Sequence, residues 1–224
     1  LKNVEGKYFT LDEYKTYIET LQKDKNETLV YLYAADAEKQ HIYIQSAQER
    51  GYDVLLMDSI LDAHFINMLE QKLEKSKFAR VDADVIDKLI EKEDSLISKL
   101  SEEERKNLSE IFENSVEKEK FTVVVESLND TDLPVMIMQN EFMRRFQDME
   151  RLSGQNGMYG RFEHYNLVVN DNNEVIVNLL KEEDAEKKSQ MTQQLVDLAL
   201  LSQNMLTGEK LSQFVRRSLD FIAK

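Results

Sequence analysis

The side chains that most often carry out catalysis or bind metals are sparse and scattered in this 224-residue chain. It contains three histidines, His41, His64 and His164, and no cysteine. None of the histidines has a second histidine at metal-ligand spacing, and the lack of cysteine excludes a thiolate zinc site, a disulfide scaffold and a cysteine nucleophile. No G-x-S-x-G elbow marks a serine nucleophile. We therefore expect neither a catalytic centre nor a metal site in this chain.

Two runs of carboxylates and one glycine-rich segment are the remaining candidates for ion or phosphate binding. The runs Glu102–Glu104 and Glu182–Asp184 fall where helices are expected to begin. Acidic side chains complement the helix dipole there, so we interpret both runs as solvated helix starts. The segment 153–160 holds three glycines at intervals of three, but it matches neither G-x-x-x-x-G-K-[ST] nor G-x-G-x-x-G. It indicates a structural loop.

The segment Gln139–Leu152 predicts an amphipathic helix with an unusual apolar stripe. Phe142, Phe146 and Met149 follow one another at spacings of four and three, and Met143 lies beside them. This stripe has two interpretations. The helix packs it into its own core, or it presents methionine and phenylalanine to apolar partners, for which the flexible methionine side chain is well suited.

The last forty residues indicate two apolar helices joined by a short turn, which is a helical hairpin. Apolar residues cover more than a third of the circumference of each helix. Either the chain buries both faces itself, or two hairpins pack about a two-fold axis into a four-helix bundle. The residues that would form this dimer interface are Leu195, Leu198, Leu201, Met205, Leu211, Phe214, Val215, Leu219 and Ile222.

The elements of the first part alternate between helix and strand. Thr10 and Glu13 form a capping box that opens a helix, and Gly51 is placed to end another. The alternation predicts a small parallel sheet with helices on its faces. The expected elements are helix 11–21, strand 28–33, helix 36–50, strand 53–57, helix 59–73 and strand 77–81.

The second part begins after an acidic stretch with a helical pattern, and the domain boundary is expected near residues 92–100. Ser101 and Glu104 form a second capping box. Residues 170–181 are ambiguous between strand and helix. The expected elements are the helix after Ser101, strands 121–126, 135–138 and 165–169, a long helix 184–205 ended by Gly208, and a final helix 209–223.

Composition excludes several broad classes of protein. The net charge of −14 argues against a nucleic-acid binder, which needs a basic surface. No apolar stretch is long enough to span a membrane, and the sequence does not open with the charged start and apolar run of a signal peptide. We expect a cytoplasmic protein with no membrane partner, and the missing initiator Met suggests a fragment or a processed chain.

Several ordered motifs make the chain similar to the C-terminal part of the bacterial, HtpG-type branch of the 90-kDa heat-shock protein (Hsp90) chaperone family. The motifs cover nearly the whole chain in the order of that family. They are YFTLDEYKTYI, the run from LVYLYAAD to GYDVLLMDSILDAHFINML, LNDTDLPVMIM, and LALLSQNMLTGEKLSQFVRRSLDFIA.

The resemblance implies an α+β protein of two parts. Residues 1–96 would be the smaller α/β/α part of the family's middle domain. Residues 97–224 would be a mixed α+β dimerisation domain that ends in the helical hairpin and forms a four-helix bundle in the dimer. The resemblance also favours a helix over residues 173–181. In this family ATP and Mg bind in an N-terminal domain upstream of Leu1, so the chain itself would bind no cofactor and hydrolyse no ATP.

The resemblance further implies a homodimer that binds non-native client proteins. The client-binding residues would be Phe142, Met143, Phe146 and Met149 on one helix and His64 and Asn67 on another. An aromatic residue is common in the family where this chain has His64. Two other functions stay open: an acidic dimeric scaffold without chaperone activity, and a small α/β enzyme, for which the sequence offers no cluster of polar groups.

Overall fold

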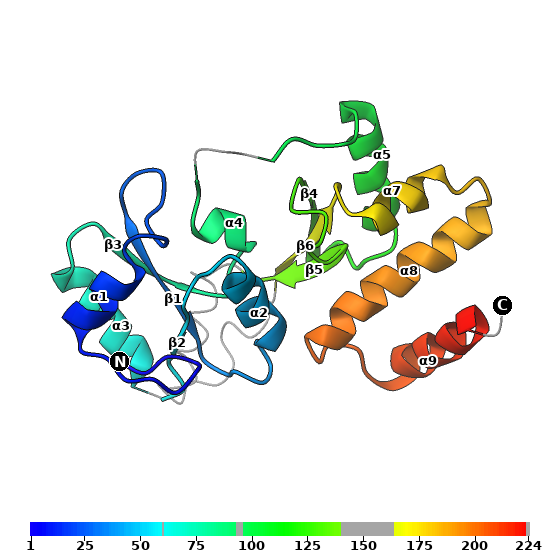
Figure 1. Ribbon diagram of the computed structural model, residues 1–224. Coiled ribbons are helices and arrows are strands. Elements are labelled where there is room, and N and C mark those ends of the chain that lie inside the picture. Colours follow the sequence, from blue (N-terminus) through cyan, green and yellow to red (C-terminus); the bar gives the residue numbers. More distant parts are fainter. Residues whose placement is uncertain (60, 93–95, 140–163, 223–224) are drawn as a thin grey trace. The chain divides into compact units, whose positions relative to one another are not determined.

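The computed structural model describes residues 1–59, 61–92, 96–139 and 164–222, and these form two compact units. The first unit comprises the described residues up to 92 together with Gln139. The second comprises 96–138 and 164–222 (Figure 1). Both units combine helices with a small sheet, which confirms the predicted α+β class.

The first unit is built on a three-stranded parallel sheet in the order β2-β1-β3. Every residue of the central strand β1 is buried, as expected for a parallel strand that is covered on both faces. Helices α1 and α3 cover one face, and α2 and α4 lie on the other (Figure 1). The elements are α1 (Leu11–Ile18), β1 (Leu29–Ala34), α2 (His41–Glu49), β2 (Leu55–Leu56), α3 (Asp62–Lys72), β3 (Ser76–Arg80) and α4 (Ile86–Leu89).

The predicted helix ends of this unit are partly confirmed. The capping box at Thr10 is present, with the Thr10 side chain and Glu13 bonded to each other's backbone N–H groups. Gly51 follows α2 at φ +76, and the N–H groups of Gly51 and Tyr52 donate to Gln48 and Ala47 in a Schellman motif. The helix expected from residue 36 begins only at His41, because the Asp36 and Gln40 side chains bind backbone N–H groups and hold a turn there.

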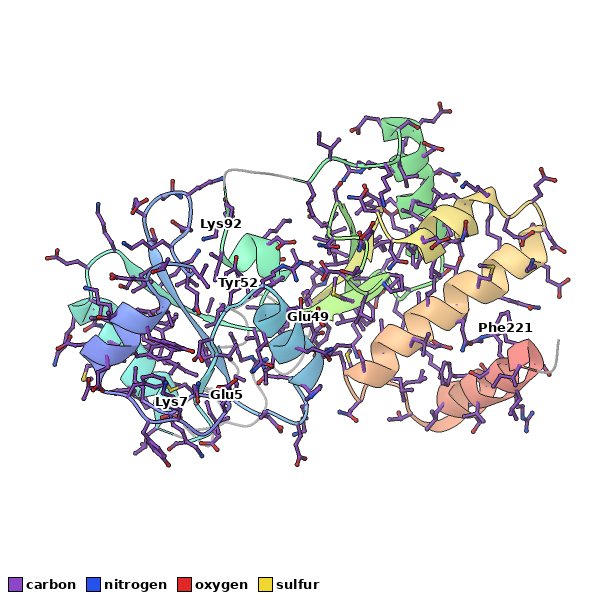
Figure 2. The ribbon with its side chains drawn as sticks, in the orientation of Figure 1. Glu5, Lys7, Glu49, Tyr52, Lys92 and Phe221 are labelled. Carbon is purple, nitrogen blue, oxygen red and sulfur yellow. The ribbon has the colours of Figure 1, made fainter. Side chains whose placement is uncertain are left out.

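Both ends of the first unit are tied to its body. The backbone of residues 2–4 runs antiparallel to β2, with Val4 N–H donating to Val54 and Leu56 N–H donating to Lys2. At the other end, the ammonium of Lys92 donates to the backbone carbonyls of Leu21 and Lys23 at 2.7 and 2.6 Å (Figure 2). The strand expected over 53–57 is only two residues long, Leu55–Leu56.

The second unit is built on a three-stranded mixed sheet in the order β4-β6-β5. The central strand β6 pairs in parallel with β4 and antiparallel with β5. Alternate strand residues, including Val135, Ile137 and Leu167, pack against α5, α7 and α8 in one core. The elements are α5 (Glu102–Glu113), β4 (Phe121–Glu126), β5 (Val135–Met138), β6 (Tyr165–Asn170), α7 (Glu174–Lys181), α8 (Ala185–Ser202) and α9 (Gly208–Ile222).

In the C-terminal region the predicted helix 173–181 and the helical hairpin are confirmed, whereas the predicted end of the long helix is wrong. Residues Glu174–Lys181 are helical, because the Asn173 side chain accepts from the N–H of Val175 and caps α7. The hairpin of α8 and α9 is present. However, α8 ends at Ser202 rather than at Met205. Asn204, at φ +56, ends it in a Schellman motif, and Gly208 is the first residue of α9.

Candidate functional site

The described residues contain neither a candidate metal site nor a membrane-spanning helix. No group of three or more His, Cys, Asp or Glu side chains among them could hold a metal ion. Within the same residues, no helix combines the length and apolar character that a membrane span requires. Exposed apolar side chains lie on or beside α3 in the first unit and on α8 and α9 in the second.

Helix α8 divides the residues predicted for the dimer interface into two groups. Leu195 is buried in the core of the second unit, together with Val196 and Ala199. Leu198 and Leu201 are exposed. Met205, just beyond the helix, is half-buried against the same core. One side of α8 is thus used inside the chain, and part of its apolar surface is left over.

Helix α9 leaves most of its apolar surface uncovered. Of its predicted interface residues, Phe214 is buried and Leu211 is half-buried, whereas Val215, Leu219 and Ile222 are exposed. Phe221, labelled in Figure 2, is also partly exposed and was not among the predicted residues. Helix α8 lies between α9 and the sheet (Figure 1). Because α9 packs chiefly on one neighbouring helix, its other sides face away from the core.

A polar cluster that the sequence analysis did not identify joins α8 to α9. Arg217 on α9 pairs with Asp197 on α8, and its Nε donates to Gln194 Oε1 at 2.8 Å. Gln194 Nε2 donates to Ser218 Oγ at 2.8 Å, and Gln193 Nε2 donates to Asp197 Oδ1 at 2.9 Å. We call these five residues the hairpin clamp. Asp197 is only 3% exposed, so its charge is compensated inside the protein.

A second polar cluster, which we call the asparagine hub, lies at the end of β6 and comprises Asn170, Asp171, Asn172 and Asn173. All four residues are buried. The amide group of Asn172 donates to the carbonyls of Ile97 and Leu128 at 3.2 and 3.1 Å and accepts from the N–H of Lys99 at 2.8 Å.

The neighbouring asparagines of the hub bind the turn of residues 128–134. Asn170 Nδ2 donates to the carbonyl of Asn129 at 2.8 Å, and Asn173 Nδ2 donates to that of Asp132 at 2.8 Å. The hub thus fixes the turn between β4 and β5, the segment before α5 and the start of α7 in one place. The motif LNDTDLP therefore owes its position to side chains some forty residues further along the chain.

The carboxylate of the hub is fully buried and pairs with a helix residue. Asp171 Oδ2 lies 2.9 Å from Arg105 Nε and accepts from Ser98 Oγ at 2.7 Å. Arg105 Nη2 also donates to the carbonyl of Val125 at 2.9 Å. These contacts attach α5 to the sheet, so the charges serve packing within the unit.

Helix α3 of the first unit presents the second group of predicted client-binding residues. His64 is exposed and Asn67 is half-buried. Beside them, Leu61, Phe65 and Met68 are between 38% and 70% exposed, and their spacing of four and three places them along one side of the helix. The stripe follows helical spacing in the sequence, but its three members were not among the predicted client-binding residues. The other predicted client-binding residues, Phe142, Met143, Phe146 and Met149, lie outside the described residues.

A half-buried carboxylate in the first unit has a perturbed pKa. Asp53 accepts hydrogen bonds from Asn3 Nδ2 at 2.7 Å and Tyr14 Oη at 2.8 Å. Desolvation raises the pKa of Asp53, and these two hydrogen bonds only partly oppose that effect. The pKa of the Tyr14 hydroxyl is also raised, chiefly by burial and then by the charge of Asp53. This network holds the N-terminal segment against α1.

Comparison with known proteins extends over nearly the whole chain. The family model described as "Hsp90 protein" matches residues 2–220. The chaperone protein HtpG of Bacteroides fragilis is 35% identical over 98% of this chain and 42% of its own length. HtpG of Bacteroides thetaiotaomicron is 34% identical over the same shares, and HtpG of Porphyromonas gingivalis is 35% identical over 96% of this chain and 42% of its own. The chain thus spans about two fifths of the length of these relatives.

Proposed function

Because the chain belongs to the Hsp90 family, we propose that it is the dimerising and client-binding part of a molecular chaperone. The names of its relatives support the chaperone function. Exposed apolar surfaces on the C-terminal hairpin and on α3, both within the described residues, support a division of that function between the two units. In this proposal residues 1–96 and 97–224 correspond to the smaller part of the middle domain and to the dimerisation domain.

The observation that carries the dimer proposal is the uncovered apolar surface of the hairpin. Leu198, Leu201, Val215, Leu219 and Ile222 are between 39% and 81% exposed. Apolar side chains gathered in this way on neighbouring helices mark an interaction surface. Two hairpins related by a two-fold axis would cover each other's exposed leucines in a four-helix bundle. Leu195 and Phe214, which the chain already buries, would support this interface from behind.

Client binding is proposed for the exposed side of α3. The stripe of Leu61, Phe65 and Met68 is apolar, and the exposed His64 and half-buried Asn67 border it. A surface of this kind can bind unfolded segments weakly and without a defined sequence, because apolar contacts are not directional. The residues 142–149 would contribute a second client surface.

Nucleotide chemistry is proposed to lie elsewhere in the whole protein. The family resemblance implies an ATP and Mg site in a preceding domain. The described residues provide no cluster of metal ligands that could replace that site. In this proposal the chain has no ATPase activity of its own, and its cytoplasmic location stays a prediction.

The dimer proposal is tested by sedimentation. We expect the chain to sediment as a dimer at tens of micromolar, and the double variant Leu198→Glu/Leu219→Glu to sediment as a folded monomer. Leu61→Glu, which places the same charge on an exposed leucine of the first unit, is the matched control and should stay dimeric. A wild-type chain that remains monomeric would overturn the dimer proposal.

The client proposal is tested by light scattering of an aggregating, chemically unfolded protein. The triple variant Leu61→Ser/Phe65→Ser/Met68→Ser should protect this protein less well than the wild-type chain, while it remains a dimer. If the wild-type chain dimerises but protects nothing, the acidic scaffold becomes the better assignment. If the triple variant protects fully, α3 is not the client surface.

A further inference from the structure

The hairpin clamp lies between two helices whose exposed apolar surfaces carry the proposed dimer. Helix α9 buries a single side chain, that of Phe214, and packs chiefly on α8. One buried ring holds a helix only loosely against rotation about its own axis. That rotation decides which of its side chains face away from α8. Something other than apolar packing must therefore fix the orientation of Val215, Leu219 and Ile222.

The geometry of the clamp restricts this rotation. Gln194 and Asp197 are three residues apart on α8 and face the adjacent residues Arg217 and Ser218 on α9. Arg217 uses two different nitrogen atoms, Nε toward Gln194 and Nη2 toward Asp197. Its planar guanidinium donates in fixed directions, which a flexible ammonium does not. Two contacts from one rigid group, together with Ser218, define both the rotation and the axial position of α9.

The burial of the clamp argues against a role in stability alone. The Asp197 side chain is 5% exposed and that of Arg217 is 18% exposed. Removing two charges from water is costly, so a buried pair contributes little net stability compared with apolar residues of similar volume. The best-attested benefit of such groups is that they select one geometry among several.

We propose that Arg217 is a positioning residue for the homodimer: with Asp197 and Gln194, it holds α9 at the rotation in which its exposed apolar side chains meet a second copy of this chain. The inference rests on the proposed dimer and deepens it. Arg217 itself contacts its own hairpin. Its effect on the second copy passes through the orientation of Val215, Leu219 and Ile222.

The main test replaces the charges by apolar groups of similar size in Asp197→Leu/Arg217→Met. Because no unpaired charge remains, this variant should keep the thermal unfolding midpoint of the wild type when both are measured at a concentration low enough for the chains to be monomeric. Its dimer dissociation constant, measured by sedimentation, should rise about tenfold or more. Arg216→Met removes the neighbouring guanidinium, which is exposed, and serves as the matched control. Its dimer dissociation constant should equal that of the wild type. An unchanged dissociation constant in a dimeric double variant would overturn the proposal.

A second measurement keeps the test decisive if the double variant does not fold. Gln194→Leu removes only the neutral bridge to Arg217 and Ser218, and it should loosen the dimer in the same direction but less. Because the chain has no cysteine, spin labels can be attached to the cysteines introduced by Ser189→Cys on α8 and Gln213→Cys on α9. The doubly labelled chain is mixed with an excess of unlabelled chain, so that the measured distance lies within one hairpin. The distance distribution between α8 and α9 should broaden when Gln194 is replaced. A distribution that stays narrow while the dimer weakens would refute the positioning role, and a wild-type monomer would instead refute the dimer itself.

Discussion

Helices α8 and α9 have similar apolar patterns in the sequence, but the chain uses them differently. Helix α8 places Leu195, Val196 and Ala199 in the core of the second unit, whereas α9 buries only Phe214. The difference follows from their neighbours, because α8 lies against the sheet and α9 lies beyond it. An apolar stripe in a sequence therefore indicates that a helix has a face to bury. The structure shows whether the same chain buries that face.

The largest expected effect separates the two helices directly. Leu195→Ala on α8 should lower the free energy of unfolding by about 3 kcal/mol, because it leaves a cavity in the core. Leu219→Ala on α9 should change the stability of the monomer by less than about 0.5 kcal/mol. Urea unfolding followed by circular dichroism at two protein concentrations measures both. The Leu195→Ala loss should not depend on concentration, whereas a Leu219→Ala loss should appear only where dimers form. Equal losses would remove the distinction between the helices.

The next effect concerns the asparagine hub, which holds the segments that lead into α5 and α7. Asn172→Ala leaves the buried carbonyl of Leu128, the carbonyl of Ile97 and the N–H of Lys99 without this partner. We expect a loss of about 2 kcal/mol in the free energy of unfolding. Asn107→Ala, on the exposed side of α5, is the control and should be nearly neutral. A neutral Asn172→Ala would show that the loops are held by other contacts, and that the core beneath α8 does not depend on the hub.

A smaller effect compares the same local device in the two units. Ser101→Ala and Thr10→Ala each remove the capping box of one helix. Each should cost about 1 kcal/mol, measured by thermal unfolding. A much larger loss of stability for Ser101→Ala than for Thr10→Ala would show that the start of α5 unfolds together with the rest of the second unit. The contrast between core and peripheral helices would then extend beyond α8 and α9.

The smallest expected effect is a pH dependence in the first unit. Since the pKa of Asp53 is raised in the folded protein, the folded state binds this proton more tightly than the unfolded state does. The contribution of Asp53 to stability is therefore fully present at pH below its ordinary pKa and is lost as pH rises through the raised value. Glu13 behaves oppositely, because hydrogen bonds from Thr10 lower its pKa.

The unfolding midpoints of the wild type and Asp53→Asn, measured as a function of pH, isolate this contribution. The wild type should lose stability relative to the variant as pH rises from about 4, the ordinary pKa of aspartate. A constant difference across the acidic range would show that Asp53 has the same pKa in both states.

Much of the fold was predictable because its signals are local. The two capping boxes, the Schellman glycine at Gly51 and the β-branched strand β4 each depend on residues within one turn or one strand. The prediction for Gly208 was wrong because Asn204 also adopts the left-handed conformation and ends α8 first. The start of α2 was misplaced because the side chains of Asp36 and Gln40 favour a turn over a helix.

The features that escaped sequence analysis depend on distant partners. Asn172 bonds to Ile97, which is 75 positions away in the sequence, and Arg217 pairs with Asp197 across the hairpin. No spacing rule links such residues, so the asparagine hub and the hairpin clamp could not be read from the pattern. The apolar residues of the hairpin could be identified, but their division into buried Leu195 and exposed Leu198 required the packing of α8 on the sheet.

The position of β6 in the middle of its sheet has a consequence for synthesis of the chain on the ribosome. Both β4 and β5 pair with β6, although β4 ends at Glu126 and β6 ends only at Asn170. Completing β6 after β4 requires the synthesis of residues 127–170, which is 170 − 126 = 44 residues and takes roughly 2–9 s at about 5–20 residues per second. First β4 alone, and then β4 and β5 together, have been made without their central partner. A newly made copy of this chain therefore passes through a stage in which it is itself in need of protection from aggregation.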